Sequence, residues 1–313
     1  MRAIVYDRFG GPEVLEERDI AAPEPASEEV LVRIRAAALN PKDIVVRAGK
    51  FRWMTGARFP MPFGHDFAGE VVALGHGARG LSVGDRVFGC WNDTRPWRGS
   101  FAEYAVSSPD ACAVLPPTLS FEEGASLGLA GQTALQALVD VARVSSRDHV
   151  LIHGASGGVG TLAVQLAKGL GAHVTTTSSS RNLPLCRQLG ADETLEYAVD
   201  APFASPRRYD VIFDVFGNRS FGEVRPVLNR MYVTTVPSAR IALDSMATLW
   251  GSQRARLVVV HPRRADLERL LRWVNDGALQ PVVDRVFTWG EVREAVRYLE
   301  TKRARGKVVV RIP

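Results

Sequence analysis

The sequence contains little cysteine. Its 313 residues include three cysteines, Cys90, Cys112 and Cys186, which lie too far apart to form a Cys-x-x-Cys motif. This spacing excludes a disulfide framework and fits a reducing compartment. The chain also shows no apolar signal core at its start and no apolar run of membrane-spanning length, so we expect a cytoplasmic protein that does not enter a membrane.

A strong excess of charge is lacking as well. The chain has 39 lysines and arginines against 34 aspartates and glutamates, which gives a net charge of +5. Such a mild excess permits an anionic cofactor or a nucleic acid and favours neither. Hydrophobic residues make up 46% of the chain and charged residues 23%, which is typical of a globular protein and excludes disorder. The length predicts about two domains.

A long stretch without acidic residues is the most informative absence. No Asp or Glu occurs between Asp148 and Asp192. Within it, an apolar run at 150–152 is followed by a glycine-rich turn and then by a helix-like stretch at 161–170. Glycine lets the backbone approach a pyrophosphate closely, and the start of the helix attracts its charge. We therefore predict a dinucleotide-binding turn rather than a merely flexible one. The turn consists of Gly154, Ala155, Ser156, Gly157, Gly158, Val159 and Gly160.

The residues after the next strand indicate which dinucleotide is bound. An NAD site usually has an acid about 20 residues beyond the glycines, where it binds the ribose 2′-hydroxyl. Here the predicted strand 173–177 is followed by three serines, Arg181 and Asn182, with Ser178 and Ser179 first. Hydroxyls and a guanidinium suit a 2′-phosphate, so we predict NADPH in preference to NADH. The alternative, that these residues cap a helix starting near Leu183, is compatible with the same cofactor.

The pattern of hydrophobic residues predicts two kinds of domain. Before residue 121, short runs separated by turns indicate an antiparallel, barrel-like domain. After it, a helix at 122–141 is followed by strands alternating with helices, which is typical of a doubly wound parallel sheet. A final helix at 291–300 and a strand at 307–312 are expected to return to the first domain. The predicted strands are 3–6, 30–37, 67–74, 85–88 and 100–106, then 150–153, 173–177, 209–214, 232–236 and 257–260.

Several ordered motifs extend this pattern over nearly the whole chain. Together they resemble the zinc-independent quinone oxidoreductase and alkenal reductase branch of the medium-chain dehydrogenase/reductase superfamily. The resemblance implies a GroES-like catalytic domain (1–123 and 283–313), a Rossmann NADPH domain (124–282), a substrate cleft and a homodimer. Besides the glycine-rich turn, the motifs lie at 37–43, 64–71, 84–87, 99–104, 130–134, 190–192 with Tyr197, and 306–310.

The resemblance also bears on zinc. A zinc alcohol dehydrogenase needs thiolate and imidazole ligands. Asn40 stands at the position of the first Cys ligand, and no Cys occurs near 127–131. Cys90 alone cannot form the family's four-cysteine lobe. His65 does match a zinc-binding His, but we predict that it forms a hydrogen bond, lines the cleft or packs in the core.

Without a metal, the chemistry that we expect is conjugate reduction of an enone, an enal or a quinone. Hydride addition there spreads charge into an enolate, which a nearby donor stabilises. By resemblance, Asn40 is the first candidate to contact the substrate or the nicotinamide ribose, although a turn Asn before Pro41 is equally compatible. Lys42 is a candidate to polarise a carbonyl, with a solvated surface lysine as the alternative. We expect Asp43 and Arg47 to form a structural ion pair.

The substrate pocket is expected to be apolar. Family members with a Tyr at two positions of this loop would have it where this chain has Val45 and Phe51, so no hydroxyl donor is expected there. The pocket would favour a hydrophobic enone that takes its proton from solvent, although its aromatic residues are equally compatible with the core. The candidate walls are Phe51, Trp53, Phe59 and Trp91.

On the cofactor side, the resemblance assigns contacts to single residues. Thr133 matches a residue at the nicotinamide end, and Arg181 and Tyr197 match contacts of the 2′-phosphate. Gly217 and Val236 end the fourth and fifth strands, where ligands of open sheets bind.

Two other functions stay open at this point. One is zinc-dependent alcohol oxidation. The other is a cofactor-binding regulator or a nucleic-acid-binding protein, in which the arginine-rich segment 254–272 contacts phosphates. We favour a solvated amphipathic helix for that segment, because leucines alternate with its arginines.

Overall fold

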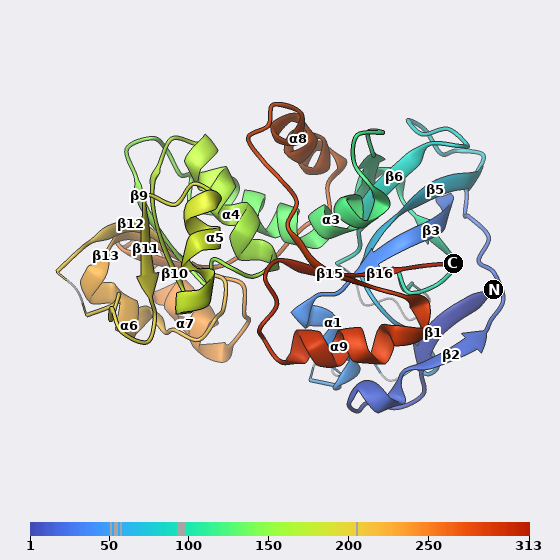
Figure 1. Ribbon diagram of the computed structural model, residues 1–313, viewed down its shortest axis with the longest axis horizontal. Helices are drawn as coiled ribbons and strands as arrows, with labels where there is room; N and C mark the ends of the chain where they lie inside the picture. Colours follow the sequence, from blue (N-terminus) through green and yellow to red (C-terminus); the bar gives the residue numbers. More distant parts are fainter. Residues whose placement is uncertain (51, 53–55, 57, 93–97, 205) are drawn as a thin grey trace. The chain divides into compact units, whose positions relative to one another are not determined.

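The computed structural model describes residues 1–50, 52, 56, 58–92, 98–204 and 206–313 (Figure 1). Two compact units make up the chain. The first unit comprises Met1–Ala130, His261–Leu271 and Pro281–Pro313, and the second comprises Gly131–Val260 and Arg272–Gln280. Residues 124–130, 261–271 and 281–282, which the predicted limits assign to the Rossmann domain, fall in the first unit.

The second unit contains a six-stranded parallel sheet in the order β11-β10-β9-β12-β13-β14. The predicted α/β fold with a doubly wound sheet is therefore confirmed. The strand order reverses between β9 and β12, and ligands of such sheets bind at the carboxyl ends beside that point. The strands are β9 (His149–His153), β10 (His173–Ser178), β11 (Glu193–Glu196), β12 (Tyr209–Asp214), β13 (Leu228–Thr234) and β14 (Arg254–Leu257).

Helices connect these strands and cover the sheet (Figure 1). Helix α4 packs on β9 and β10, α5 on β10 and β11, and α7 on β14. Because parallel crossovers are right-handed, the reversal of strand order places the two groups of helices on opposite faces. The helices are α4 (Gly158–Gly169), α5 (Leu183–Gln188), α6 (Phe221–Val224) and α7 (Ala239–Ala247), with α8 (Arg264–Asn275) after β14.

Several elements differ from the sequence prediction, among them β13, which covers Leu228–Thr234 instead of 232–236. The last strand of this sheet covers Arg254–Leu257 instead of 257–260. Its buried Ala255 stands between two arginines, so the segment does not show the apolar pattern from which strands were predicted. Strand β11 was not predicted, since its sequence ETLE is polar and half-buried. The helix predicted at 122–141 is α3 (Phe121–Leu135) followed by a π-helical segment, Gln136–Val141.

The first unit is built from a three-stranded and a seven-stranded sheet. The small sheet has the order β2-β1-β4, and the large one has the order β15-β16-β3-β5-β6-β8, with β7 paired to β3. The last strand, β16, pairs antiparallel with β3, so the end of the chain completes a sheet begun near its start. The strands are β1 (Arg2–Tyr6), β2 (Glu16–Asp19), β3 (Val30–Ala38), β4 (Met61–Pro62), β5 (Asp66–Leu74), β6 (Arg86–Cys90), β7 (Tyr104–Ser107), β8 (Cys112–Val114), β15 (Val283–Phe287) and β16 (Lys307–Arg311).

Helices α1 (Pro41–Arg47) and α9 (Val292–Glu300) contact each other in the first unit. The core beside them contains apolar residues from both ends of the chain, among them Ile34, Phe67 and Val308. The 3-10 helices are Pro12–Val14, Pro109–Ala111, Ser180–Asn182, Arg225–Val227 and Trp289–Glu291. No helix in the described part of the chain has the length and hydrophobicity needed to span a membrane.

Candidate functional site

The glycine-rich turn joins β9 to α4, and its glycines have different surroundings. Gly154 has a φ of +84°, a conformation that residues with a side chain rarely adopt. A Cβ added at Gly160 would lie 2.3 Å from the Gly154 carbonyl oxygen, so the turn closes too tightly for any side chain there. At Gly157, by contrast, the nearest atom would be 3.8 Å away. The turn thus offers open space at the amino end of α4, as a bound pyrophosphate requires.

The carboxyl end of β10 lies directly beside this turn. The Thr177 carbonyl oxygen accepts hydrogen bonds from the backbone of Gly154, at 3.3 Å, and of Ala155, at 3.2 Å. The Asn182 amide donates to the Ser156 hydroxyl at 2.9 Å. Although Asn182 is the N-cap residue of α5, its side chain makes no capping hydrogen bond there. The segment after β10 is therefore held against the glycine-rich turn by hydrogen bonds.

The residues predicted to bind a 2′-phosphate lie together at this end of the sheet. Ser178 ends β10, and its carbonyl oxygen accepts a hydrogen bond from the Tyr197 backbone at 3.2 Å. Ser179 and Arg181 follow directly, and the side chains of Arg181 and Tyr197 are exposed. One acid is also near, because Glu196 on β11 pairs with Ser178 in the sheet register.

Gly217 and Val236 meet after β12 and β13. A Cβ added at Gly217, where φ is +68°, would lie 2.1 Å from a methyl carbon of Val236. The buried Asp214 fixes this loop, since its carboxylate accepts the Gly217 backbone N–H at 2.7 Å. Phe216 of the same loop lies beside Gly154. The carboxyl ends of β9, β12 and β13 therefore converge beside the glycine-rich turn.

A buried histidine that sequence reasoning missed connects these loops. His153 ends β9, and its Nδ1 lies 2.6 Å from the Thr177 hydroxyl and its Nε2 2.9 Å from Oδ1 of Asn218. Because an amide oxygen only accepts, Nε2 carries the proton and Nδ1 accepts from Thr177. Burial lowers the pKa of His153, so the ring is neutral at pH 7. The available signal was a histidine at the end of an apolar run, directly before the glycines.

The remaining predicted cofactor residue, Thr133, lies in α3 and is buried. Within the turn itself, Ala155 and Gly160 are buried, whereas Ser156, Gly157, Gly158 and Val159 are half-buried. The assignment of cofactor contacts to these residues stays a prediction.

In the first unit, Asn40 belongs to a buried polar network. Its amide donates to Asp66 at 2.9 Å, and its amide oxygen accepts from the Lys307 ammonium at 2.7 Å. Lys307 and Asp66 form a direct ion pair of 2.8 Å, and Asp66 also accepts the Leu129 backbone N–H at 2.6 Å. Asp66 is 0% exposed and Lys307 4%, so each charge depends on the other. Sequence reasoning missed both ionic partners.

The predicted ion pair between Asp43 and Arg47 is wrong. The Asp43 carboxylate accepts the Asn40 backbone N–H at 2.7 Å and pairs with Nδ1 of His65. Arg47 turns toward α9 instead, where it pairs with Glu300 at 2.6 Å. A carboxylate at the third position of a helix reaches back to the helix start, so Asp43 is directed away from Arg47.

The two other catalytic candidates are both held by neighbours. His65 is 8% exposed, and because a carboxylate only accepts, its Nδ1 carries the proton shared with Asp43. The Lys42 ammonium is half-buried and donates to the Asn92 backbone oxygen at 3.0 Å and side-chain oxygen at 2.7 Å. Lys42 is therefore not a fully solvated surface lysine.

The predicted pocket walls are placed only in part. Trp91 is 3% exposed and stacks on Phe67 with ring centroids 4.5 Å apart, so it lies in the core. Phe59 is half-buried and packs edge-on against Tyr6 and Phe9. Phe51 and Trp53 fall outside the described residues.

Comparisons with known proteins agree with this architecture. The family model described as "Alcohol dehydrogenase GroES-like domain" matches residues 26–117, and the one described as "Zinc-binding dehydrogenase" matches residues 189–310. The "2-methylene-furan-3-one reductase" of Solanum lycopersicum is 36% identical over 319 residues, which cover 99% of this chain and 79% of that protein. The chain belongs to the medium-chain dehydrogenase/reductase superfamily.

A second curated relative and a solved structure also resemble this chain over nearly its whole length. The chloroplastic "NADPH-dependent alkenal/one oxidoreductase" of Arabidopsis thaliana is 34% identical over 99% of this chain and 79% of that protein. The solved structure of the quinone oxidoreductase from Coxiella burnetii is 34% identical, with a TM-score of 0.91 over 100% of this chain and 99% of that one. The predicted family is confirmed, and the protein is an oxidoreductase that uses a pyridine nucleotide.

The three thiols of this dehydrogenase/reductase are buried, and none of them forms a disulfide in the described part of the chain. Burial raises the pKa of the Cys112 thiol to about 12 and also raises that of Cys186, so both remain protonated at pH 7. Among the residues that the structure describes, His65 belongs to no group of three His, Cys, Asp or Glu residues able to share an ion.

Proposed function

We propose that the protein is a cytoplasmic, zinc-independent reductase that transfers hydride from NADPH to a quinone or to the β-carbon of an α,β-unsaturated carbonyl. The observation that carries this proposal is the gathering of Ser178, Ser179, Arg181 and Tyr197 beside the glycine-rich turn. The names of the relatives, which are reductases of enones, alkenals and quinones, support the substrate class. Three buried cysteines that form no disulfide within the described residues fit the reducing compartment that the proposal assumes.

The second unit would bind the cofactor. The backbone N–H groups of the turn and the amino end of α4 hold the pyrophosphate. Arg181, Tyr197 and the two serines hold the 2′-phosphate, because a guanidinium and hydroxyls donate to its oxygens. Thr133, Gly217 and Val236 are assigned to the nicotinamide end. When bound, NADPH supplies a hydride.

The first unit would bind the substrate. Lys42 is a cation held in place by Asn92, and we assign it to the carbonyl oxygen, where negative charge develops during reduction. His65 presents a ring whose orientation Asp43 fixes. Asn40 is assigned to the same contact region, where its amide is already oriented by Asp66 and Lys307. Proton delivery to the enolate is assigned to solvent.

A turnover assay with parallel metal analysis tests the proposal. We expect the purified protein to oxidise NADPH with simple enones, alkenals or quinones, with kcat/KM at least about tenfold above that with NADH, since one charge-assisted hydrogen bond contributes about 1.5–3 kcal/mol. We also expect this activity to persist after all zinc has been removed with a chelator. Equal use of NADH, or activity that disappears with removal of a stoichiometric zinc, would contradict the proposal.

One observation favours the alternative, a zinc-dependent alcohol dehydrogenase. A carboxylate bound to the second ring nitrogen of a histidine is the usual support for a metal-binding imidazole, and Asp43 has this relation to His65. The thiols of Cys112 and Cys186 are buried and protonated, so the remaining zinc ligands would have to be other residues. Oxidation of a simple alcohol by zinc-loaded protein would support this alternative.

Nucleic-acid binding has less support. Arg263 pairs with Asp266 at 2.7 Å and Arg264 with Glu268 at 2.8 Å, so these arginines already have acidic partners on α8. Leu267 of the same helix is buried, as expected for an amphipathic helix.

We further propose a homodimer formed through the second unit. Strand β14 ends the sheet, and the adjoining α7 and the turn after it expose apolar side chains that include Met246 and Trp250, the latter 92% exposed. Such patches mark protein interfaces. Trp250→Glu should convert a dimer to a monomer in light scattering, whereas Val199→Glu, at an exposed valine elsewhere in the unit, should not. A monomeric unmodified protein would refute the dimer.

A further inference from the structure

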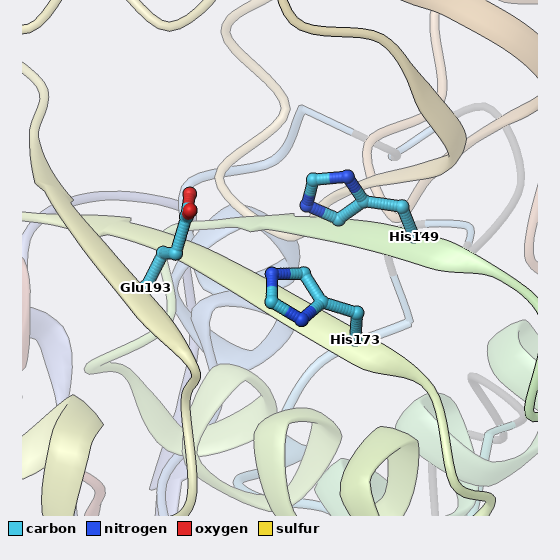
Figure 2. Close-up of side chains that lie close together, drawn as sticks. All are labelled: His149, His173 and Glu193. Atoms are coloured by element: carbon cyan, nitrogen blue, oxygen red, sulfur yellow. The ribbon is translucent and has the colours of Figure 1, made fainter.

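A second cluster of reactive side chains lies at the opposite edge of the parallel sheet (Figure 2). His149, His173 and Glu193 are the first residues of β9, β10 and β11, which are neighbours in the sheet. The register pairs His173 with His149, and Thr175 with Glu193. Paired residues of adjacent strands share a face, as do residues two apart on one strand, so the three side chains project from the same side. One ligand atom from each lies within 4.8 Å of the others.

We propose that His149, His173 and Glu193 form a binding site for a divalent transition-metal ion of the zinc type. Two imidazoles and a carboxylate are ligands that zinc prefers, and three protein ligands leave a fourth position for water. Zinc bonds of about 2.0–2.1 Å require ligand atoms roughly 3.4 Å apart, so rotation of partly exposed side chains has to close about 1.5 Å. Figure 2 shows both rings directed toward the Glu193 carboxylate.

The surroundings already orient the two rings. Asp192 lies 3.7 Å from Nδ1 of His173, which leaves Nε2 of that ring facing the cluster. A carboxylate in this position is typical of metal-binding histidines. The Thr175 hydroxyl lies 2.8 Å from Nε2 of His149 and 3.3 Å from Glu193, so it bridges the place that the ion would take.

One cation competes for this site. Arg207 forms an ion pair with Glu193, so a bound metal would have to displace the guanidinium. Removal of the Arg207 charge should therefore strengthen metal binding, while removal of any ligand weakens it. A merely structural cluster would not respond in these opposite directions.

The site is separate from the proposed reaction. The cluster lies at the amino ends of β9, β10 and β11, whereas the glycine-rich turn and Ser178 lie at the carboxyl ends. A bound ion would join three strands and stabilise the second unit without entering the reaction. We expect zinc to raise the melting temperature of the protein and leave kcat unchanged.

Calorimetric titration of the metal-free protein with Zn²⁺ at pH 7 tests the site. We expect one ion per chain, with affinity at least about 10- to 100-fold weaker in His149→Ala, His173→Ala and Glu193→Gln, since even outer partners of metal ligands contribute that much. Arg207→Gln should bind more tightly than the unmodified protein. Should His149→Ala fail to fold, His173→Ala decides, because its side chain is 50% exposed.

Two histidines of the first unit serve as controls. His65→Ala and His76→Ala should keep the affinity of the unmodified protein. Unchanged affinity in His173→Ala would overturn the proposal. Loss of binding in His65→Ala alone would also overturn it, because the ion would then occupy the first unit, and that result would separately contradict zinc independence.

Discussion

Arg181→Ala is expected to lower kcat/KM for NADPH about 10- to 100-fold and to leave that for NADH within about twofold. The change removes a guanidinium assigned to the 2′-phosphate, and a charge-assisted hydrogen bond contributes about 1.5–3 kcal/mol. NADH lacks this phosphate, so kcat/KM with NADH serves as the internal control for the variant. Steady-state rates with one enone and both cofactors provide the measurement.

Two variants make this test specific. Arg187→Ala removes another exposed arginine, six residues away on α5, and should leave the use of both cofactors unaffected. Glu196→Gln probes the acid that pairs with Ser178 in the sheet register. In an NADPH site its loss relieves repulsion of the phosphate and should keep or raise the preference for NADPH. Impaired use of NADH in Glu196→Gln, together with no effect of Arg181→Ala, would identify an NAD site.

Lys307→Met is expected to lower the free energy of unfolding by about 3–5 kcal/mol, the usual cost of leaving a buried charge unpaired. Asp66 would lose an ammonium 2.8 Å away and remain fully buried, with hydrogen bonds from Asn40 and the Leu129 backbone. Urea unfolding, followed by fluorescence, gives the difference in midpoint and slope.

The control for this change removes both charges. The double variant Asp66→Asn with Lys307→Met should recover much of the loss, because no buried charge is left without a partner. Lys302→Met, at an exposed lysine of the same unit, should change stability by less than about 0.5 kcal/mol. Equal losses in the single and double variants would show that the network contributes through packing and not through charge.

Local sequence patterns predicted the strand, the glycine-rich turn and the helix of the second unit well. A strand, a glycine-rich turn and a helix are adjacent in sequence, and their arrangement follows from backbone sterics at residues such as Gly154 and Gly160. Ser178 and Arg181 are also close in sequence, so one motif was enough to place them beside the turn. Fold class and family followed from the same local signals.

Contacts between residues far apart in the sequence could not be predicted from those patterns. Asp66 and Lys307 are 241 residues apart, and nothing in either local sequence states that they meet. The predicted pair of Asp43 with Arg47 was wrong, because His65 and the backbone at the helix start bind the Asp43 carboxylate instead. Strand β11 was not predicted and β14 was predicted too late in the sequence, because both strands are rich in polar residues.

The position of β16 has a consequence for synthesis on the ribosome. This strand lies between β15 and β3, yet its residues Lys307–Arg311 are translated long after β3. The second unit ends at Gln280, whereas the edge of β3 in the first unit stays incompletely paired until β16 has been made. Until Lys307 has been made, Asp66 has no ammonium to neutralise it, so the nascent first unit completes its buried polar network only after that residue leaves the ribosome.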